Sequence, residues 1–449
     1  MFAAIDVGSY ELSMKIFEIS PKVKMREIDH IRHRIDLGTE TYTTGKLSRE
    51  KVDELCRILS EYAQIMQTYR VTDYKAYGTS AIREMVNRTI VLEQIKMRTG
   101  IKIDVLSNSE QRFLDYKSVA SRGEQFNGLI SSGTAILDIG GGSIQVSLFD
   151  KDSLVTTQNM RLGILRLRER LFQLKLKPSQ YEEIIEELVT GQIEVLEKLY
   201  LKERQIDNII VVDEYISSAL LKKGNGLTQQ YIDAENYLEF IKVIRRHSIA
   251  ELGKKFQVPE ESIFLLYISS MLVLKFLKTM GAKRLWVPGV TLCDGIGYEY
   301  AEKNKIFSTN HDFEKDIIDC TQNISRRYMG SRKRGETLER IALTIFDAMK
   351  RIHGLGRRER LLLRLAALLH DCGKYITMTG VGEASYEIIM STEIIGLSHA
   401  EREIVANVVH YNYQEFVYYG DGRECTLDQE SYLIVAKLTA ILRVATGLD

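Results

Sequence analysis

Two short segments of this chain combine a carboxylate with small residues in a pattern suited to anion binding. Residues 138–143 read DIGGGS and follow a buried apolar run. Glycines let backbone N–H groups approach an anion closely, and Asp138, at the strand end, is suited to holding Mg²⁺ or water beside that anion. Residues 6–9, DVGS, offer the same elements in shorter form. Each segment alone also fits an ordinary glycine turn, but together they favour a phosphate-binding cleft.

Strands must flank both segments if they are to act as binding turns. Residues 2–7 and 12–19 are predicted as strands around the first turn, and 135–139 and 144–149 as strands around the second. The repeated strand–turn–strand pattern predicts two related α/β domains that face each other across a cleft.

The rest of the first 300 residues alternates helices with strands. An amphipathic helix is predicted over 49–70, after Ser48. Further helices are expected from Ala81, near Ser109 and over 163–174 and 178–201. The remaining predicted strands are 74–77, 103–106, 209–212 and 285–287.

The pattern changes after about residue 305. Amphipathic helices with short connections are predicted over 315–350, 358–372, 383–395, 399–411 and 428–446. We therefore expect three domains: residues 1–122 and 123–304, both α/β, and an all-α domain over 305–449. The boundary before the last domain is placed in the polar segment 303–311.

Composition excludes several classes of protein. The 449 residues carry 61 Lys+Arg and 61 Asp+Glu, and this zero formal charge argues against a generally basic nucleic-acid binder. We expect no specific DNA binding. The sequence has no run of about 18 uncharged apolar residues, so no membrane-spanning helix is expected. Five scattered cysteines without a C-x-x-C pair, and a charged N-terminal segment, predict a reduced, cytoplasmic protein.

Four segments resemble, in order and spacing, the exopolyphosphatase/guanosine pentaphosphate phosphohydrolase (Ppx/GppA) family. They are MFAAIDVGSYELSMKIFEI, YGTSAIREMVNR, LDIGGGSIQVSLFD and RLGILRLRERL. This family belongs to the acetate-kinase, sugar-kinase and actin superfamily. The later segment LLRLAALLHDCGKY resembles the HD-type helical domain that many members append.

The resemblance implies a fold and a reaction. The fold is two ribonuclease-H-like domains plus an HD-like helical domain. The reaction is Mg²⁺-dependent attack of water on the terminal phosphoryl group of polyphosphate or of a guanosine pentaphosphate, and a homodimer is expected. The implied phosphate-binding residues are Asp6, Gly8, Ser9, Thr79, Ser80, Arg83, Gly140, Gly141, Gly142 and Ser143, with Arg83 as a clamp. Asn87, Gly163, Arg166 and Glu169 also match the family pattern.

Several positions depart from that pattern. Aligned without gaps, the stretch 106–119 places Glu110 at the first of two family glutamates and Gln111 at the second, catalytic one. Gln145 stands where the family has a metal-holding glutamate, so the implied metal ligands are Asp138 and, weakly, Gln145. Tyr10 replaces an asparagine and Cys293 an arginine. Asp213 and Glu214 replace a glycine loop and are expected to repel a polyanion.

These departures leave two functions open. A glutamine accepts no proton at neutral pH, and loss of a general base lowers a rate by roughly 10²–10⁴-fold. The first hypothesis is a hydrolase with Mg²⁺ at Asp138 and with water oriented by Glu110 or Gln111. In this case Gln111→Glu combined with Gln145→Glu raises activity if only the carboxylates are missing. The second is a polyphosphate- or nucleotide-binding regulatory protein with little turnover.

The helical domain departs from its pattern in the same way. His370 and Asp371 match the HD pair, which binds metal together with histidines of other helices. Only His410 lies nearby in sequence, so we expect a structural, hydrogen-bonded pair rather than a metal site. The positions for further histidines hold Arg334, Ala384 and Asn412. Basic clusters near 326–334 and 357–364 fit either a polyanion groove or solvated helix faces.

Overall fold

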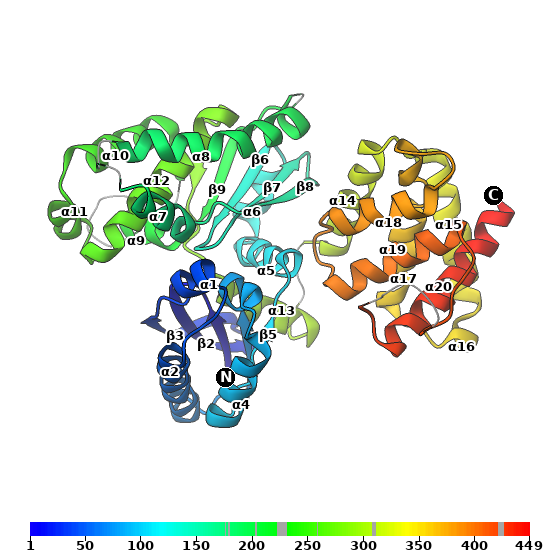
Figure 1. The fold of residues 1–449 in the computed structure, drawn as a ribbon, viewed down its shortest axis with the longest axis horizontal. Coiled ribbons are helices and arrows are strands. Elements are labelled where there is room, and N and C mark those ends of the chain that lie inside the picture. Colours follow the sequence, from blue (N-terminus) through cyan, green and yellow to red (C-terminus); the bar gives the residue numbers. More distant parts are fainter. Residues whose placement is uncertain are drawn as a thin grey trace. The chain divides into compact units, whose positions relative to one another are not determined.

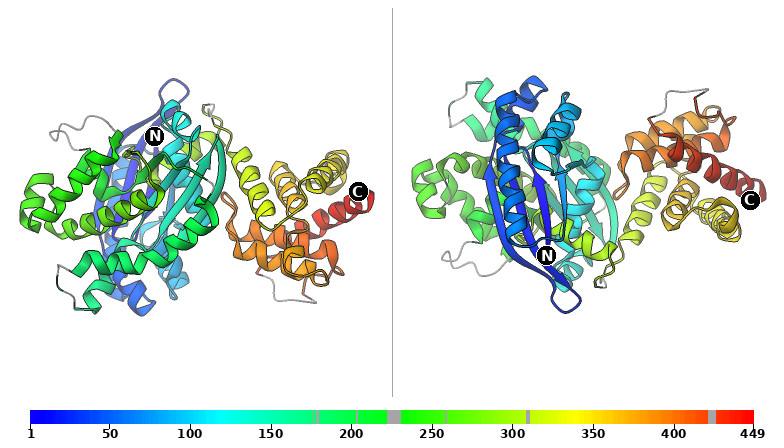
Figure 2. Two further views of the ribbon diagram at one scale, coloured as in Figure 1. Left: turned by 90° about the horizontal axis from the view of Figure 1, so that it is seen from above. Right: turned by 90° about the horizontal axis from the view of Figure 1, so that it is seen from below.

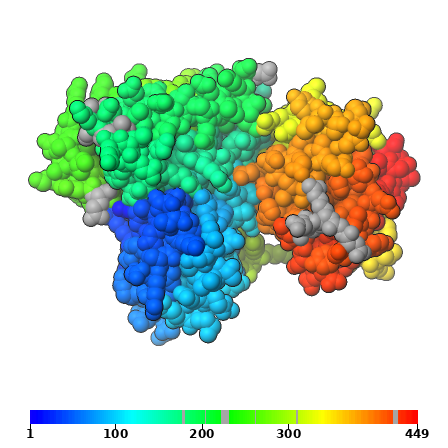
Figure 3. Space-filling view, viewed as in Figure 1, coloured from blue at the N-terminus to red at the C-terminus, as the bar shows by residue number. Residues whose placement is uncertain are grey.

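The computed structural model describes residues 1–175, 177, 180–202, 204–221, 231–257, 259–307, 311–420 and 426–449. It divides into two compact units. The first comprises residues 1–152 and 158–311, and the second comprises 312–449 with 153–157. The first unit holds two α/β lobes, whose surfaces meet in Figure 3.

The first lobe is built on a five-stranded sheet of order β3-β2-β1-β4-β5. β1 pairs antiparallel with β2, placing Asp6 opposite Ser13, and parallel with β4. Figure 2 shows β2 and β3 as a long hairpin. The strands are β1 (Phe2–Val7), β2 (Glu11–Ser20), β3 (Lys24–Arg34), β4 (Asp73–Gly78) and β5 (Asp104–Val105).

The second lobe repeats this arrangement in a six-stranded sheet of order β10-β11-β9-β6-β7-β8. β6 pairs antiparallel with β7 and parallel with β9, as β1 does with β2 and β4. The predicted pair of related α/β lobes is thereby confirmed (Figure 1). The strands are β6 (Thr134–Ile139), β7 (Ile144–Asp150), β8 (Ser153–Met160), β9 (Asn208–Val212), β10 (Tyr231–Asp233) and β11 (Arg284–Trp286).

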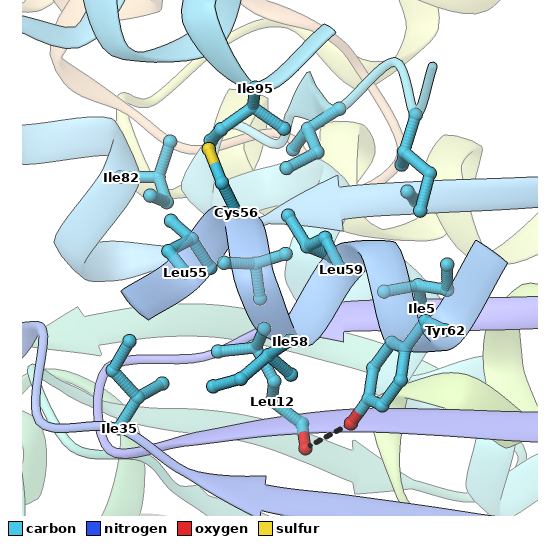
Figure 4. Close-up of a cluster of buried hydrophobic side chains, with 14 of the residues drawn as sticks. Ile5, Leu12, Ile35, Leu55, Cys56, Ile58, Leu59, Tyr62, Ile82 and Ile95 are labelled. Atoms are coloured by element: carbon cyan, nitrogen blue, oxygen red, sulfur yellow. Dashed lines mark hydrogen bonds between the residues drawn. The ribbon is translucent and has the colours of Figure 1, made fainter. Parts of the chain in front are cut away.

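Helix α2 (Arg49–Thr68) forms the core of the first lobe. Its side chains at Leu55, Ile58, Leu59 and Tyr62 follow helical spacing and lie buried against the sheet (Figure 4). The Tyr62 hydroxyl donates a 2.8 Å hydrogen bond to the carbonyl of Leu12, so its polar end is also satisfied.

The remaining helices of this unit cover the two sheets. They are α1 (Gly38–Thr44), α3 (Ser80–Glu84), α4 (Arg88–Thr99), α5 (Asn108–Ala120), α6 (Glu124–Ile130), α7 (Ile164–Gln173), α8 (Tyr181–Leu196) with a π-helical turn (Glu197–Leu201), α9 (Glu214–Leu220), α10 (Ala234–Arg246), α11 (Ile249–Phe256), α12 (Glu260–Met280) and α13 (Leu292–Lys303).

Helix α13 returns to the first lobe, although the sequence places it at the end of the second. Leu292, Cys293 and Ile296 pack in one apolar cluster with residues of β1, β2 and α5. Gly295 lies so close to α5 that a Cβ atom there would stand 1.9 Å from the carbonyl oxygen of Leu114. The second lobe is therefore an insertion between α5 and α13. The expected domains 1–122 and 123–304 assign α13 to the second lobe, whereas it packs in the first.

The second unit is helical, as expected. The prediction of one helix over 315–350 is wrong, because Met329 adopts a positive φ of 55° and Ser331 caps a new helix. The helices are α14 (Phe313–Arg327), α15 (Arg332–Ala348), α16 (Lys350–His353), α17 (Arg357–Leu368), a 3₁₀ turn (Cys372–Tyr375), α18 (Val381–Ser391), α19 (His399–Tyr413) and α20 (Gln429–Leu448).

Two helices of the described chain are long and apolar enough to cross a membrane by length and composition alone. In the first, Ser262–Met280, 72% of the apolar window is buried inside the protein, as in a core helix. In the second, Gln429–Leu448, the buried share is 39%.

Candidate functional site

A cleft opens between the two lobes of the first unit. It lies where β1 and β6 end, with α5 and the start of α9 as further walls. Its lining residues are Asp6, Gly8, Ser9, Tyr10, Glu11, Thr79, Ser80, Gln111, Asp115, Asp138, Ile139, Gly140, Gly141, Gly142, Ser143, Ile164, Val212, Asp213, Glu214, Tyr215, Val290, Thr291 and Leu292.

The two glycine turns have the same local structure. The N–H of Gly8 donates to the carbonyl of Glu11 at 3.1 Å, and that of Gly140 donates to Ser143 at 2.9 Å. Each turn follows a strand whose penultimate residue is a carboxylate, Asp6 or Asp138. These matching turns line one cleft, which is the arrangement that the sequence predicted.

The second turn approaches α1 and α3 of the first lobe so closely that Gly142 has no room for a side chain. A Cβ atom there would lie 2.1 Å from the Ser80 hydroxyl oxygen and 2.2 Å from that of Tyr42. Tyr42 also forms a 2.7 Å hydrogen bond with Ser9. Thr79 and Ser80 therefore belong to the cleft, as expected, whereas Tyr42 carries no recognisable motif and was not predicted.

Two arginines of α7 join the lobes at the rim. Arg166 donates to the Gly142 carbonyl at 2.7 Å and pairs with Glu84, while Arg168 donates to Asp36 at 2.7 Å. Arg166 thus fixes the second turn from outside the lining.

Three carboxylates from different elements gather in the cleft. Burial and the nearby Asp138 raise the pKa of Asp6 to about 7. Burial also raises the pKa of Asp138 to about 6, against the opposing effects of a hydrogen bond with Asp115 and the charge of Arg112. The pKa of Asp115 lies well above the usual range because of burial and then the charge of Asp138. Sequence reasoning missed Asp115, which belongs to none of the quoted motifs.

Helix α5 assigns different positions to the two candidate water-orienting residues. Glu110 accepts from the N–H and hydroxyl of Ser107, at 3.0 and 2.6 Å, and so caps the helix. Gln111 lines the cleft. The expectation that Glu110 orients water is therefore wrong.

The expected clamp, Arg83, does not line the cleft. Its guanidinium donates to the carbonyl of Leu106 at 2.8 Å and to Gln111 Oε1 at 3.3 Å. Arg83 is therefore hydrogen-bonded to Leu106, just before α5, and to Gln111 in its first turns. In this structure it does not take the predicted position of a direct phosphate contact.

Gln145 is buried beneath the second turn. Gln145 lies directly opposite Asp138 in the β6–β7 pairing, and it is only 2% exposed. Neither amide atom has a hydrogen-bond partner in the part of the chain that the structure describes. A buried amide without partners has an unfavourable free energy unless a ligand satisfies it.

The two carboxylates after β9 are engaged by the protein itself. Asp213 accepts from the N–H of Ile216 at 2.6 Å and from the hydroxyl of Ser269 at 2.7 Å, and Glu214 pairs with Arg32. Burial nevertheless raises the pKa of Asp213 to about 6. The expected repulsion of a polyanion is therefore weakened by these contacts.

The donor set of the cleft fits a small divalent cation. Asp138 and Asp6 line the cleft and offer carboxylate oxygens, which are hard ligands of the kind that Mg²⁺ takes. The Gln145 amide, opposite Asp138 in the β6–β7 pairing but not part of the lining, offers a further oxygen of this kind. Asp6 Oδ1 has no hydrogen-bond partner among the described residues. Within the described ranges, no group of three or more His, Cys, Asp or Glu side chains is placed to hold a metal ion alone. Phosphate oxygens and water would have to complete the shell.

The HD pair differs from its expected form. His370 is buried and its Nδ1–H donates to Ala367 at 2.9 Å, but its Nε2 lies 3.8 Å from Asp371, beyond a hydrogen bond. Asp371 instead accepts from the N–H of Ser331 at 3.3 Å. Arg334, at the position of a family histidine, pairs with Asp449.

Most arginines of the basic clusters are in ion pairs, which favours solvated helix faces over a polyanion groove. The pairs are Arg332–Glu336, Arg357–Glu314, Arg358–Glu401, Arg360–Asp347 and Arg364–Glu339.

Comparison with known proteins decides the family. The model of the Ppx/GppA phosphatase family matches residues 16–300, and that of Ppx/GppA phosphatase domain III matches 319–449. The chain belongs to the Ppx/GppA phosphatase family. A guanosine-5'-triphosphate,3'-diphosphate pyrophosphatase of Photobacterium profundum is 21% identical over 432 residues, covering 91% of this chain and 80% of the relative. Exopolyphosphatase 1 of Mycobacterium tuberculosis is 25% identical over 163 residues, covering 36% and 46%.

Solved structures show that this Ppx/GppA chain has the family fold. The Aquifex aeolicus family member aligns with a TM-score of 0.56 and 22% identity over 69% of this chain and 99% of its own. An exopolyphosphatase of Cytophaga hutchinsonii aligns with a TM-score of 0.59 and 18% identity over 68% and 99%.

Proposed function

We propose that this Ppx/GppA phosphatase hydrolyses the terminal phosphoanhydride of inorganic polyphosphate or of guanosine pentaphosphate. The observation that carries the proposal is the pair of matching glycine turns, at Gly8 and Gly140–Gly142, on one cleft. Two sets of backbone N–H groups can hold successive phosphates of a chain. The relatives named guanosine-5'-triphosphate,3'-diphosphate pyrophosphatase and exopolyphosphatase 1 support the two substrates.

Different residues of the cleft would bind the phosphates and the cation. The turns and the hydroxyls of Ser9 and Ser143 bind and orient the terminal phosphates. Asp138, with Asp6 and the Gln145 carbonyl, would hold Mg²⁺. This ion, when bound, neutralises charge on the phosphates. Closure of the lobes through Arg166 excludes bulk water from the reacting phosphate.

The test is Mg²⁺-dependent release of phosphate from each substrate. The wild-type protein is expected to turn over within the usual hydrolase range of roughly 1–10³ s⁻¹. Asp138→Asn should lower kcat by about 10²-fold or more, since it removes the anionic ligand that would hold Mg²⁺ beside the phosphates. Asp53→Asn, on the exposed face of α2, is the matched control and should leave kcat unchanged.

The competing function is binding without turnover, which the amides at Gln111 and Gln145 favour. Calorimetric binding of polyphosphate by a wild-type protein that releases no phosphate would support this second function and refute the hydrolase.

A further inference from the structure

We propose that Tyr42 of α1 is a positioning residue that sets the separation of the two glycine turns. This inference rests on the proposed function, because it concerns how the cleft holds successive phosphates of one chain. Tyr42 does not line the cleft itself, whereas Ser9 and Gly142 do. Its hydroxyl group acts through these two residues, one from each turn.

Helix α1 is fixed to the first turn. The backbone N–H groups of Leu37 and Gly38 both donate to the carbonyl of Ser9, at 2.9 and 2.7 Å. The Tyr42 ring lies against the start of the same helix, since a Cβ atom added at Gly38 would stand 3.0 Å from its Cε2 atom. The same added atom would stand 3.2 Å from the Cβ atom of Ser9. Tyr42 therefore keeps a constant position relative to the first turn.

The hydroxyl group of Tyr42 contacts both turns. It forms the 2.7 Å hydrogen bond with Ser9 in the first turn. In the second turn, a Cβ atom added at Gly142 would lie only 2.2 Å from this oxygen, so the backbone of Gly142 packs directly against it. One oxygen atom thus lies between the two turns and limits how closely they can approach each other.

The ring of Tyr42 is fixed from the second lobe. The guanidinium carbon of Arg166 lies 4.0 Å from the ring centroid, within the range of a cation–π contact. The Nε–H of the same guanidinium donates to the carbonyl of Gly142 at 2.7 Å. One side chain of α7 therefore holds both the ring and the second turn, and removal of the hydroxyl alone leaves this contact in place.

A second hydroxyl, that of Ser80, also lies beside Gly142, 2.1 Å from the added Cβ atom. Ser80 belongs to α3, and its Oγ donates to Glu84 of the same helix at 3.2 Å. Ser80 therefore packs against the second turn, whereas Tyr42 contacts the second turn and is also hydrogen-bonded to the first.

The separation of the turns matters for a ligand that spans both of them. Two phosphates joined by one bridging atom have a fixed spacing, so both turns bind them well only when the turns are already held at that spacing. A single phosphate needs only one turn and is insensitive to the separation. Loss of the Tyr42 hydroxyl should therefore weaken the binding of a diphosphate and leave the binding of inorganic phosphate unchanged.

The test uses ligands that the protein cannot hydrolyse. Calorimetry in saturating Mg²⁺ compares methylenediphosphonate, in which a carbon atom joins two phosphonate groups, with inorganic phosphate. Tyr42→Phe should raise the Kd of methylenediphosphonate by about 3–10-fold, the equivalent of one lost hydrogen bond, and change the Kd of inorganic phosphate by less than about twofold. Tyr62→Phe is the matched control, because it removes a 2.8 Å hydrogen bond from the core of the same lobe, and it should alter neither Kd.

A double-mutant cycle separates this role from a merely structural one. Ser9→Ala removes the hydrogen-bond partner of the Tyr42 hydroxyl, so Tyr42→Phe should weaken the binding of methylenediphosphonate no further in this background. Fully additive losses would show that the hydroxyl does not act through Ser9 and would overturn the inference. An unchanged Kd of methylenediphosphonate in Tyr42→Phe, or an equal loss for both ligands, would overturn it as well.

The outcomes also separate this inference from the proposed function. A wild-type protein that binds methylenediphosphonate but releases no phosphate from polyphosphate or guanosine pentaphosphate refutes only the hydrolase, and the variants still decide the inference. A wild-type protein that binds neither ligand refutes both. Should Tyr42→Phe fail to fold, Tyr42→Met replaces it, because methionine keeps a long apolar side chain without the hydroxyl.

Discussion

Replacing Gly163 by alanine should displace the second glycine turn and lower kcat/KM for phosphate release. Gly163 caps α7 and lies against the second glycine turn. An added Cβ atom would stand 2.2 Å from the carbonyl oxygen of Gly141 and 2.3 Å from the backbone N of Ser143. Atoms so placed do not approach closer than 3.0 Å, so the turn and α7 must separate by about 0.8 Å (from 2.2 to 3.0 Å).

The consequence for binding follows from the hydrogen bonds that tie α7 to the turn. Ile164 and Leu165 donate to the carbonyls of Gly140 and Gly141 at 3.1 and 2.9 Å, so the displacement cannot be confined to one side. Overpacking lowers the free energy of unfolding by about 1–3 kcal/mol. A misplacement of this size at a reacting group lowers a rate by about 10²-fold.

The assay compares kcat/KM for phosphate release with the melting temperature of Gly163→Ala. Gly191→Ala, in the interior of α8, is the matched control, because no described atom lies within 4 Å of its added Cβ. It should keep full activity and gain about 0.5–1 kcal/mol of stability. Unchanged kcat/KM in Gly163→Ala would show that the second turn does not hold the reacting phosphate.

Three other predictions concern the lobe that carries β1. Burial lowers the pKa of His30 to about 4 from 6.5. The unfolded chain therefore binds more protons between these values, and stability falls as the pH drops from 6.5 towards 4. His30→Gln should reduce the loss of unfolding free energy between pH 7 and 4.5 by about 2 kcal/mol, and denaturant titrations showing the same loss in both proteins would contradict this. Gly295→Ala should lower the free energy of unfolding by more than about 2 kcal/mol, measured by denaturation, since its Cβ would meet the Leu114 carbonyl at 1.9 Å; an unaffected midpoint would refute this contact. Tyr62→Phe should cost about 1 kcal/mol through the lost hydrogen bond to Leu12, and a neutral result would mean that water replaces it.

The hydrophobic pattern of the sequence was sufficient to predict the strands that position the two glycine turns. Alternating or continuous apolar runs identified β1, β2, β6 and β7, because one-sided or complete burial leaves a direct trace in sequence. β3 was missed, since its burial pattern is mostly exposed and its charged residues resemble a loop. The break between α14 and α15 was also missed, although Gly330 and Ser331 mark it.

The site was predictable where backbone geometry demands glycine and not where side chains converge from distant elements. Gly140–Gly142 were recognisable because N–H groups and close approach require them. Asp115 was not, because only the tertiary packing of α5 turns it towards Asp138. The orientation of Glu110 was also not predictable from its place in the family motif. Its carboxylate caps α5 by accepting hydrogen bonds from Ser107, three positions earlier, and does not line the cleft.

The return of α13 to the first lobe has a consequence for the order of synthesis. The apolar side chains of Phe2 and Phe17 are sealed by Leu292 and Ile296, nearly 300 residues downstream. At typical translation rates of 5–20 residues per second, the sheet stays unsealed for on the order of 10–40 s after α5 has emerged. The inserted lobe has its strands complete before that moment. We therefore expect the growing chain to expose a hydrophobic surface that attracts chaperones, and truncations ending before residue 292 to aggregate.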